Sequence, residues 1–218
     1  MKKQQVDHVL RAAGRITGQK RFIIVGSQAL HGSFPDVADD IEKSAEVDLV
    51  ATEHASGAEW LNAIGYLSSF HETFGYYADP VDRTTATLPN GWEDRLVRLS
   101  PGDTDGVQGL CLDPHDLAIS KYVAGRGKDL TFTHELAARG LVSRATLLAL
   151  LEQTRLDDAA RERIRGRIAS DFQDRTSRGA DAHPPAARNS PRERKQRSKI
   201  PAPAHRGSAR SRARRRRR

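Results

Sequence analysis

The fold of this 218-residue chain depends most on residues 22–51, which begin Phe22-Ile23-Ile24-Val25-Gly26-Ser27 and end Glu46-Val47-Asp48-Leu49-Val50-Ala51. The first four residues are apolar and mostly β-branched, which predicts a buried strand that stops at Gly26. A short helix is expected from Ser27 to about Gly32, and a second strand over residues 47–51. Alternation along a strand places Glu46 and Asp48 on one face.

This pair of acids is the chemically informative feature. Two neighbouring carboxylates repel each other, so the arrangement is most stable when a cation lies between them, and hard divalent ions such as Mg²⁺ prefer oxygen ligands. Gly26 allows a close approach of the backbone, and Ser27 heads a helix whose free N–H groups favour anions. The two elements therefore predict a place where a phosphate and a metal ion meet.

The surrounding pattern alternates helix and strand up to about residue 110 and is helical afterwards. Asp113-Pro114 is a strong helix start, with Asp113 as N-cap, and Gly125 closes that helix. The other helices are expected over residues 6–16, 56–67, 129–139, 143–151 and 157–172, and further strands over 74–78 and 95–99. We therefore predict an α/β domain with a mixed sheet over residues 1–110 and a helical part over residues 111–174.

Charge is distributed unevenly along the chain. Residues 175–218 hold 16 Lys and Arg against 2 Asp and Glu, whereas residues 1–174 hold 20 against 26. The basic stretch has almost no apolar periodicity, which predicts a disordered Arg-rich tail. Two interpretations stay open: a sequence-independent arm for RNA or DNA, or a solvated extension of an arginine-rich, GC-rich coding frame.

Several classes of protein are excluded by composition. No stretch approaches the roughly 20 apolar residues of a membrane-spanning helix. The lysines at the N-terminus are followed by no apolar run, so a secretory signal is not expected. The single cysteine, Cys111, rules out an internal disulfide and a multi-cysteine zinc site, and its apolar neighbours predict a buried side chain. A cytoplasmic location fits these features.

The order Gly26-Ser27, then Glu46-Val47-Asp48 on the next strand, resembles the signature of the nucleotidyltransferase superfamily. Three longer blocks, residues 25–36 with 44–49, residues 88–97 and residues 116–129, look like a bacterial branch of that superfamily, the group called domain of unknown function 6036. The block over residues 116–129 is also similar to a segment of AbiEii-type toxin transferases. The resemblance covers roughly residues 5–155.

The resemblance implies a metal-dependent transfer of a nucleotidyl group from a nucleoside triphosphate to a hydroxyl of RNA or protein. Gly26 and Ser27 would bind phosphate, and Glu46 and Asp48 would bind Mg²⁺. A third carboxylate, which completes a two-metal clamp and helps to deprotonate the attacking hydroxyl, is expected at Asp79, with Asp82 as the second choice.

Two features depart from the usual pattern. The first metal ligand is Glu46 where the superfamily usually has Asp, and 18 residues separate Ser27 from Glu46, more than the roughly dozen common in active members. The alternative function is accordingly a catalytically inactive member that acts as an antitoxin-like, regulatory binding protein, with nucleic-acid affinity supplied by the tail.

The helical part contributes positive charge. Lys121 lies within an otherwise apolar stretch, so its side chain either extends along the surface to water or points into a polar cleft; we expect the cleft. Lys121 and Arg126 would then neutralise the triphosphate, and Lys128 would bind substrate or, with Asp129, orient the helical part. Asp129 would orient the helical part against the site or serve as a helix N-cap.

Overall fold

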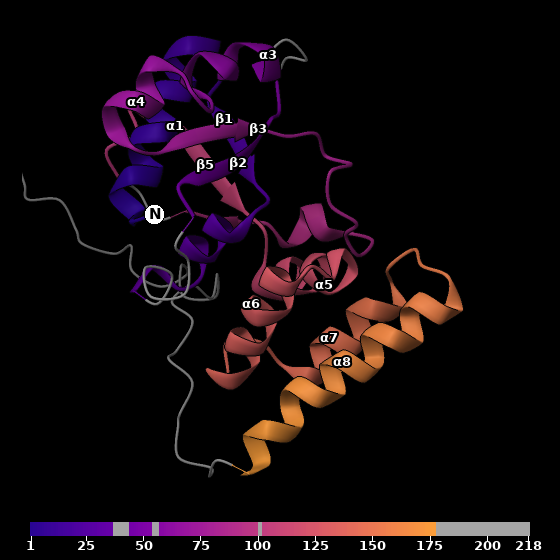
Figure 1. Cartoon of the computed structure of the whole chain (residues 1–218). Coiled ribbons are helices and arrows are strands. Elements are labelled where there is room, and N and C mark those ends of the chain that lie inside the picture. The colour runs from indigo at the N-terminus through magenta and orange to yellow at the C-terminus, as the bar shows by residue number, and fades with distance from the viewer. Residues whose placement is uncertain (37–43, 54–56, 100–101, 178–218) are drawn as a thin grey trace, which may run out of the picture. The chain divides into compact units, whose positions relative to one another are not determined.

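The computed structural model describes residues 1–36, 44–53, 57–99 and 102–177, and the side chains as far as residue 173. A five-stranded sheet has the order β3-β2-β1-β5-β4. Helices of the first half pack against this sheet, and further helices follow it in the chain (Figure 1). The strands are β1 (Arg21–Ile24), β2 (Glu46–Ala51), β3 (Tyr77–Pro80), β4 (Val97–Arg98) and β5 (Gln108–Cys111). The Arg-rich tail predicted for residues 175–218 lies outside the described residues from residue 178 onward.

The sheet mixes parallel and antiparallel pairs, as predicted. β1 pairs antiparallel with β2 and parallel with β5, while β2 pairs parallel with β3. The antiparallel β1–β2 pair brings the end of β1 back beside the start of β2, so Val25 N donates to Asp48 O at 3.2 Å. This pairing sets the Gly26-Ser27 turn next to the acidic residues of β2.

The helices that pack against the sheet in the first half differ in part from the prediction. α1 (Lys3–Thr17) and the 3₁₀ helix η1 (Ser27–Gly32) lie where expected. The helix expected over residues 56–67 is shorter: α3 (Gly57–Leu61) passes into the 3₁₀ helix η2 (Asn62–Ile64) and ends at Gly65. α4 (Ser69–Phe74) was not predicted. Ser68 accepts from His71 N as its N-cap, which takes Phe74 out of the strand expected over residues 74–78.

The far side of the sheet also corrects the prediction. The strand expected over residues 95–99 shrinks to the two residues of β4, because residues 92–95 form the 3₁₀ helix η3 (Trp92–Arg95). β5 was missed, since its short sequence Gln-Gly-Leu-Cys lacks the β-branched residues that indicate a strand. It is nevertheless an interior strand, held between β1 and β4.

The helical part agrees with the prediction. It contains α5 (Pro114–Ala124), α6 (Gly127–Ala138), α7 (Arg144–Glu152) and α8 (Asp158–Ser177). Asp113 caps α5 by accepting from His115 N, and Ser143 caps α7 by accepting from Thr146 N. α6 begins two residues earlier than expected, with Arg126 at its N-cap position, so Asp129 is not the cap and its side chain is available for other contacts.

The two parts share one apolar core. It includes residues of α1, of the central strands and of all four C-terminal helices, and Cys111 is fully buried within it. Among the described residues no helix is long and apolar enough to cross a membrane. The core holds β1, β2 and α5 in fixed relation, and the cavity described next lies where these elements meet.

Candidate active site

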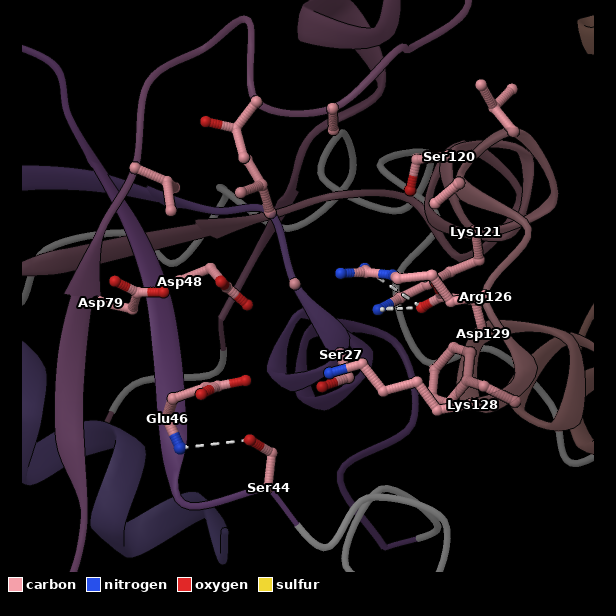
Figure 2. A pocket seen from close by; sticks show the side chains of 18 of the residues that line it. Ser27, Ser44, Glu46, Asp48, Asp79, Ser120, Lys121, Arg126, Lys128 and Asp129 are labelled. Carbon is pink, nitrogen blue, oxygen red and sulfur yellow. Dashed lines mark hydrogen bonds and ion pairs between the residues drawn. The ribbon is translucent and has the colours of Figure 1, made fainter. Parts of the chain in front are cut away.

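Three carboxylates occupy neighbouring positions on β2 and β3. In the parallel pairing Asp48 stands opposite Asp79, and Glu46 stands opposite Tyr77. Glu46 and Asp48 are two residues apart on β2 and therefore share a face. Figure 2 shows the side chains of Glu46 and Asp48 directed toward the space in front of Ser27. The structure therefore places Glu46 and Asp48 beside Ser27, as expected from the sequence.

The Asp48 carboxylate lies directly against the backbone of Gly26. A Cβ atom built on Gly26 would overlap Asp48 Oδ2 and come within 2.6 Å of Cγ. The backbone at Gly26 is extended, with φ −86°, so any residue could adopt its conformation. Glycine is needed here for space and not for its conformational freedom.

Electrostatic repulsion is evident in this acidic group. The pKa of Asp48 is raised to about 6, first by burial and then by the charges of Glu46 and Asp79, and Lys121 and Lys128 only partly oppose this. The pKa of Asp79 is also raised, by burial and by Glu46. Burial and the neighbouring carboxylates therefore disfavour the charged forms of Asp48 and Asp79, and the nearby lysines do not offset this for Asp48.

Glu46 is held in place from two sides. Tyr77 Oη donates a hydrogen bond to Glu46 Oε2 at 2.8 Å, and the backbone N of Glu46 donates to Ser44 Oγ at 3.2 Å. Burial and this bond to an anionic acceptor raise the pKa of Tyr77 to about 12, so the phenol stays protonated and remains a donor. One carboxylate oxygen of Glu46 is therefore occupied, and the other faces the cavity.

The opposite wall carries cations from α5 and α6. Asp129, whose side chain is 1% exposed, binds Lys121 Nζ at 3.2 Å through Oδ1 and Arg126 Nε at 2.6 Å through Oδ2. Lys121 Nζ also lies 5.6 Å from the centre of the Phe132 ring. These two cations lower the pKa of Asp129. One buried carboxylate thus sets the position of both cations.

A single cavity of about 690 Å³ brings the predicted residues together. Its lining includes all eight residues for which the sequence suggested a role in binding or catalysis: Gly26, Ser27, Glu46, Asp48, Asp79, Lys121, Arg126 and Lys128. Asp82, the second choice for a third carboxylate, is not part of the lining; it is exposed and accepts hydrogen bonds from the Thr84 N and Oγ1 atoms. Lys121 points into the cleft and not along the surface.

The sequence did not identify two residues of this site. The sequence analysis gives Tyr77 no role beyond its place in a strand. Tyr77 and Asp79 are two residues apart in the run Tyr76-Tyr77-Ala78-Asp79, so alternation along a strand places them on the same face. Asp129 was considered only as an orienting residue or a cap. Its spacing from Arg126, three residues within a helix, is a signal for an ion pair; its contact with Lys121 on another helix has no local signal.

Glu46 and Asp48 offer oxygen donors of the kind that a hard divalent metal ion prefers. Among the described residues no group of three His, Cys, Asp or Glu side chains forms a ready-made metal site. Mg²⁺ is usually held by one or two carboxylates together with substrate phosphates and water, and not by a complete protein cage. Glu46 and Asp48, which both line the cavity, match that partial set.

Comparisons with known proteins agree with the resemblance seen in the sequence. A family model described as a nucleotidyltransferase of unknown function (DUF6036) matches residues 3–178. No curated protein matches the chain, and no solved structure does. Members of a nucleotidyltransferase family are expected to act on nucleotides with a divalent metal. The match extends over all but two of the described residues and includes both walls of the cavity, and the chain therefore belongs to the DUF6036 family of nucleotidyltransferases.

Proposed function

We propose that this protein is a Mg²⁺-dependent enzyme that transfers a nucleotidyl group from a nucleoside triphosphate to a hydroxyl of RNA or protein. The observation that carries the proposal is the opposition of three carboxylates and three cations across one cavity, next to the Gly26-Ser27 turn. A polyphosphate with a bound divalent cation is the ligand that satisfies both walls at once.

The cationic wall would bind the triphosphate. Lys121 and Arg126 are fixed by Asp129, so little conformational entropy is lost when phosphate oxygens replace water on their remaining N–H groups. Lys128 reaches toward Ser27 from the same wall (Figure 2). In the transfer step these positive charges would stabilise the pyrophosphate as it leaves.

The acidic wall would hold the metal and activate the acceptor. Glu46 and Asp48 would be the protein ligands of Mg²⁺, which when bound neutralises phosphate charge and polarises the phosphorus centre. Asp79 Oδ would accept the proton of the acceptor hydroxyl, and its raised pKa makes it a better base than an ordinary aspartate. The hydroxyl oxygen forms a bond to the α-phosphorus, and the bond from that phosphorus to the β-phosphate oxygen breaks.

A label-transfer assay tests the proposal. The full chain is incubated with Mg²⁺ and nucleoside triphosphates labelled at the α-phosphate, together with total RNA or total protein as acceptor. We expect transfer that Asp48→Asn lowers by about 10³-fold, the equivalent of the several kcal/mol that a metal ion contributes. Glu162→Gln, an exposed change on α8, is the matched control and should leave transfer unchanged.

Binding of the nucleotide is measured on the same preparations. Mg²⁺ with triphosphate should raise the melting temperature of the wild type, and Asp48→Asn should lose this shift. A shift without any transfer to either acceptor would support the inactive, regulatory interpretation and contradict the enzyme; absence of both would contradict nucleotide binding altogether.

A further inference from the structure

One segment of the chain exposes several large apolar side chains. Among the residues that the structure describes, four large hydrophobic side chains are exposed, and all four lie between residues 60 and 74: Trp60, Tyr66, Leu67 and Phe74, with exposed fractions of 52%, 66%, 68% and 46%. They belong to α3, to α4 and to the turn between η2 and α4. Exposed apolar side chains gathered in one segment indicate an interaction surface.

Part of this surface is connected to the site. The rings of Tyr66, His71 and Tyr77 form a row, with centroids 5.2 Å apart for the first pair, 4.7 Å for the second, and 5.4 Å between the two tyrosines. Tyr77 then donates its hydrogen bond to Glu46. We call Tyr66, Leu67, His71 and Tyr77 the aromatic row; it runs from solvent to a carboxylate of the cavity.

Leu67 has a backbone conformation that exposed leucines rarely adopt. Its φ is +60°, in the left-handed region that costs a non-glycine residue about 1 kcal/mol or more. Its N–H donates to His71 Nδ1 at 3.1 Å, so the turn is fixed to the row. Leu67 therefore combines a strained backbone with an apolar side chain exposed to water, and neither stabilises the fold. This combination is typical of a residue that binds a partner.

The charge of this region decides what it can bind. Residues 44–82 contain no Lys or Arg and seven Asp or Glu. The cations that act on this segment belong to other parts of the chain: Arg21 pairs with Glu53 at 3.7 Å, and Lys121 and Lys128 influence Asp48 from the far side of the cavity. Arg11, which influences Tyr76, is itself bound to Asp103. An RNA strand needs Lys or Arg to neutralise its phosphates, whereas protein interfaces are enriched in aromatic residues and depleted in lysine.

We propose that the aromatic row is the docking surface for a protein acceptor, so that the enzyme modifies a hydroxyl side chain of another protein and not RNA. This inference rests on the proposed function. β3 is the edge strand of the sheet, so an acceptor seated on the row reaches Asp79 without crossing another strand. The partner's surface carries apolar side chains ringed by Lys or Arg, which complement the exposed acids Glu59, Glu72 and Asp82.

The reaction is balanced with the triphosphate as the only co-reactant. The oxygen of a Ser, Thr or Tyr hydroxyl on the acceptor forms a bond to the α-phosphorus, the bond to the β-phosphate oxygen breaks, and the proton passes to Asp79. The products are a phosphodiester on the acceptor protein and pyrophosphate.

The test compares acceptors and a surface variant. A bacterial lysate is divided into total protein and total RNA, and each is incubated with the full chain, Mg²⁺ and α-labelled triphosphates. We expect label on proteins other than the enzyme, removed by protease and resistant to nuclease. The double variant Tyr66→Ala with Leu67→Gly should lower this labelling at least tenfold, since aromatic anchors dominate such interfaces, and glycine suits the φ at position 67.

Three controls make the result decisive. The double variant must keep the rise in melting temperature that Mg²⁺ and triphosphate produce, because neither side chain lines the cavity. Its own melting temperature should fall slightly, since Tyr66→Ala removes ring contacts with His71 and Tyr77. Arg163→Ala on α8 is the matched exposed change and should not affect labelling. Label on RNA, or protein label that the double variant does not lower, would overturn the inference while the proposed function stands. A wild-type dimer that the double variant dissociates would identify a second copy as the occupant and also overturn it. No nucleotide-dependent shift and no label on any acceptor would defeat the proposed function itself.

Discussion

Asp48 and Asp129 stand on opposite walls of the same cavity and titrate in opposite directions. The pKa of Asp48 is raised to about 6 by burial and by two neighbouring carboxylates, whereas Lys121 and Arg126 lower the pKa of Asp129 despite its burial. Burial raises the pKa of both aspartates, and their partners decide the net direction: carboxylates stand beside Asp48, whereas Arg126 and Lys121 contribute hydrogen bonds and positive charge to Asp129.

This contrast shows that the two walls are built for different purposes. In the cationic wall, the buried carboxylate of Asp129 binds Lys121 and Arg126 and fixes their positions, and the wall keeps a net positive charge. The acidic wall is incomplete, because Glu46, Asp48 and Asp79 face one another with too little positive charge between them. The buried carboxylate of Asp129 thus positions the cations beside it. The clustered carboxylates of the acidic wall, whose charged forms are disfavoured, indicate where a cation binds.

Removing Asp129 should give the largest loss of stability. Asp129→Ala leaves Lys121, which is only 17% exposed, beside Arg126 without their shared carboxylate. Breaking a buried ion pair from one side costs about 3 to 5 kcal/mol, and urea unfolding should show this as a lower midpoint with an unchanged slope. Asp129→Asn keeps the shape and should cost less. Equal stability of Asp129→Ala and wild type would mean that the cationic wall does not depend on this residue.

Neutralising Asp48 should increase the stability of the protein, whereas removing Asp129 should decrease it. Because its folded pKa of about 6 exceeds the ordinary value of 3.8, the folded state binds the proton more tightly, and wild-type stability falls as the pH rises from about 4 to about 6. Two pKa units correspond to about 2 to 3 kcal/mol. Without divalent ions, Asp48→Asn should therefore be more stable than wild type by up to this amount at pH 7.5.

A pH series checks this sign. Melting curves of wild type and Asp48→Asn in the absence of Mg²⁺ should coincide near pH 4, separate as the pH rises from about 4 to about 6, and stay apart above that. Glu59→Gln, an exposed change on α3, is the matched control and should follow the wild type throughout. A variant that is less stable than the wild type at pH 7.5 would refute the view that the acidic wall is strained.

Gly26→Ala tests the contact that joins β1 to the acidic wall. The added methyl group would overlap the Asp48 carboxylate, so one of the two must move, at a cost of about 1 to 3 kcal/mol. On an Asp48→Ala background the same change should cost much less, which a double-mutant cycle would report as a coupling of at least about 1 kcal/mol. Additive effects would show that Asp48 does not lie against Gly26.

Tyr77→Phe should have the smallest effect. It removes one hydrogen bond to a partly exposed carboxylate, worth about 1 kcal/mol, and it frees Glu46 to change rotamer. We expect a loss of stability of this size and a fall in label transfer of up to about tenfold, while Mg²⁺ and triphosphate still raise the melting temperature. Tyr66→Phe keeps the ring and removes no hydrogen bond that the structure shows among the described residues, so it should match the wild type in stability.

The parts of the fold that could be predicted are those with a strong local cause. The buried run at residues 22–25, the Asp113 and Ser143 caps and the apolar spacing of the later helices each depend on neighbours in sequence, and each element formed. β5 and α4 could not be predicted in the same way. β5 is a strand because β1 and β4 pair with it, and α4 replaces part of an expected strand because Ser68 caps it.

The candidate site divides in the same manner. The sequence by itself determined that Glu46 and Asp48 share a face, because side chains alternate along every strand, and that a serine follows a buried strand. Only the tertiary structure decided that Asp79 stands beside Asp48, that Tyr77 holds Glu46, and that Asp129 holds two cations across the cavity. Those contacts join β2 to β3 and α5 to α6, and their geometry depends on strand register and helix packing, which no local pattern of residues specifies.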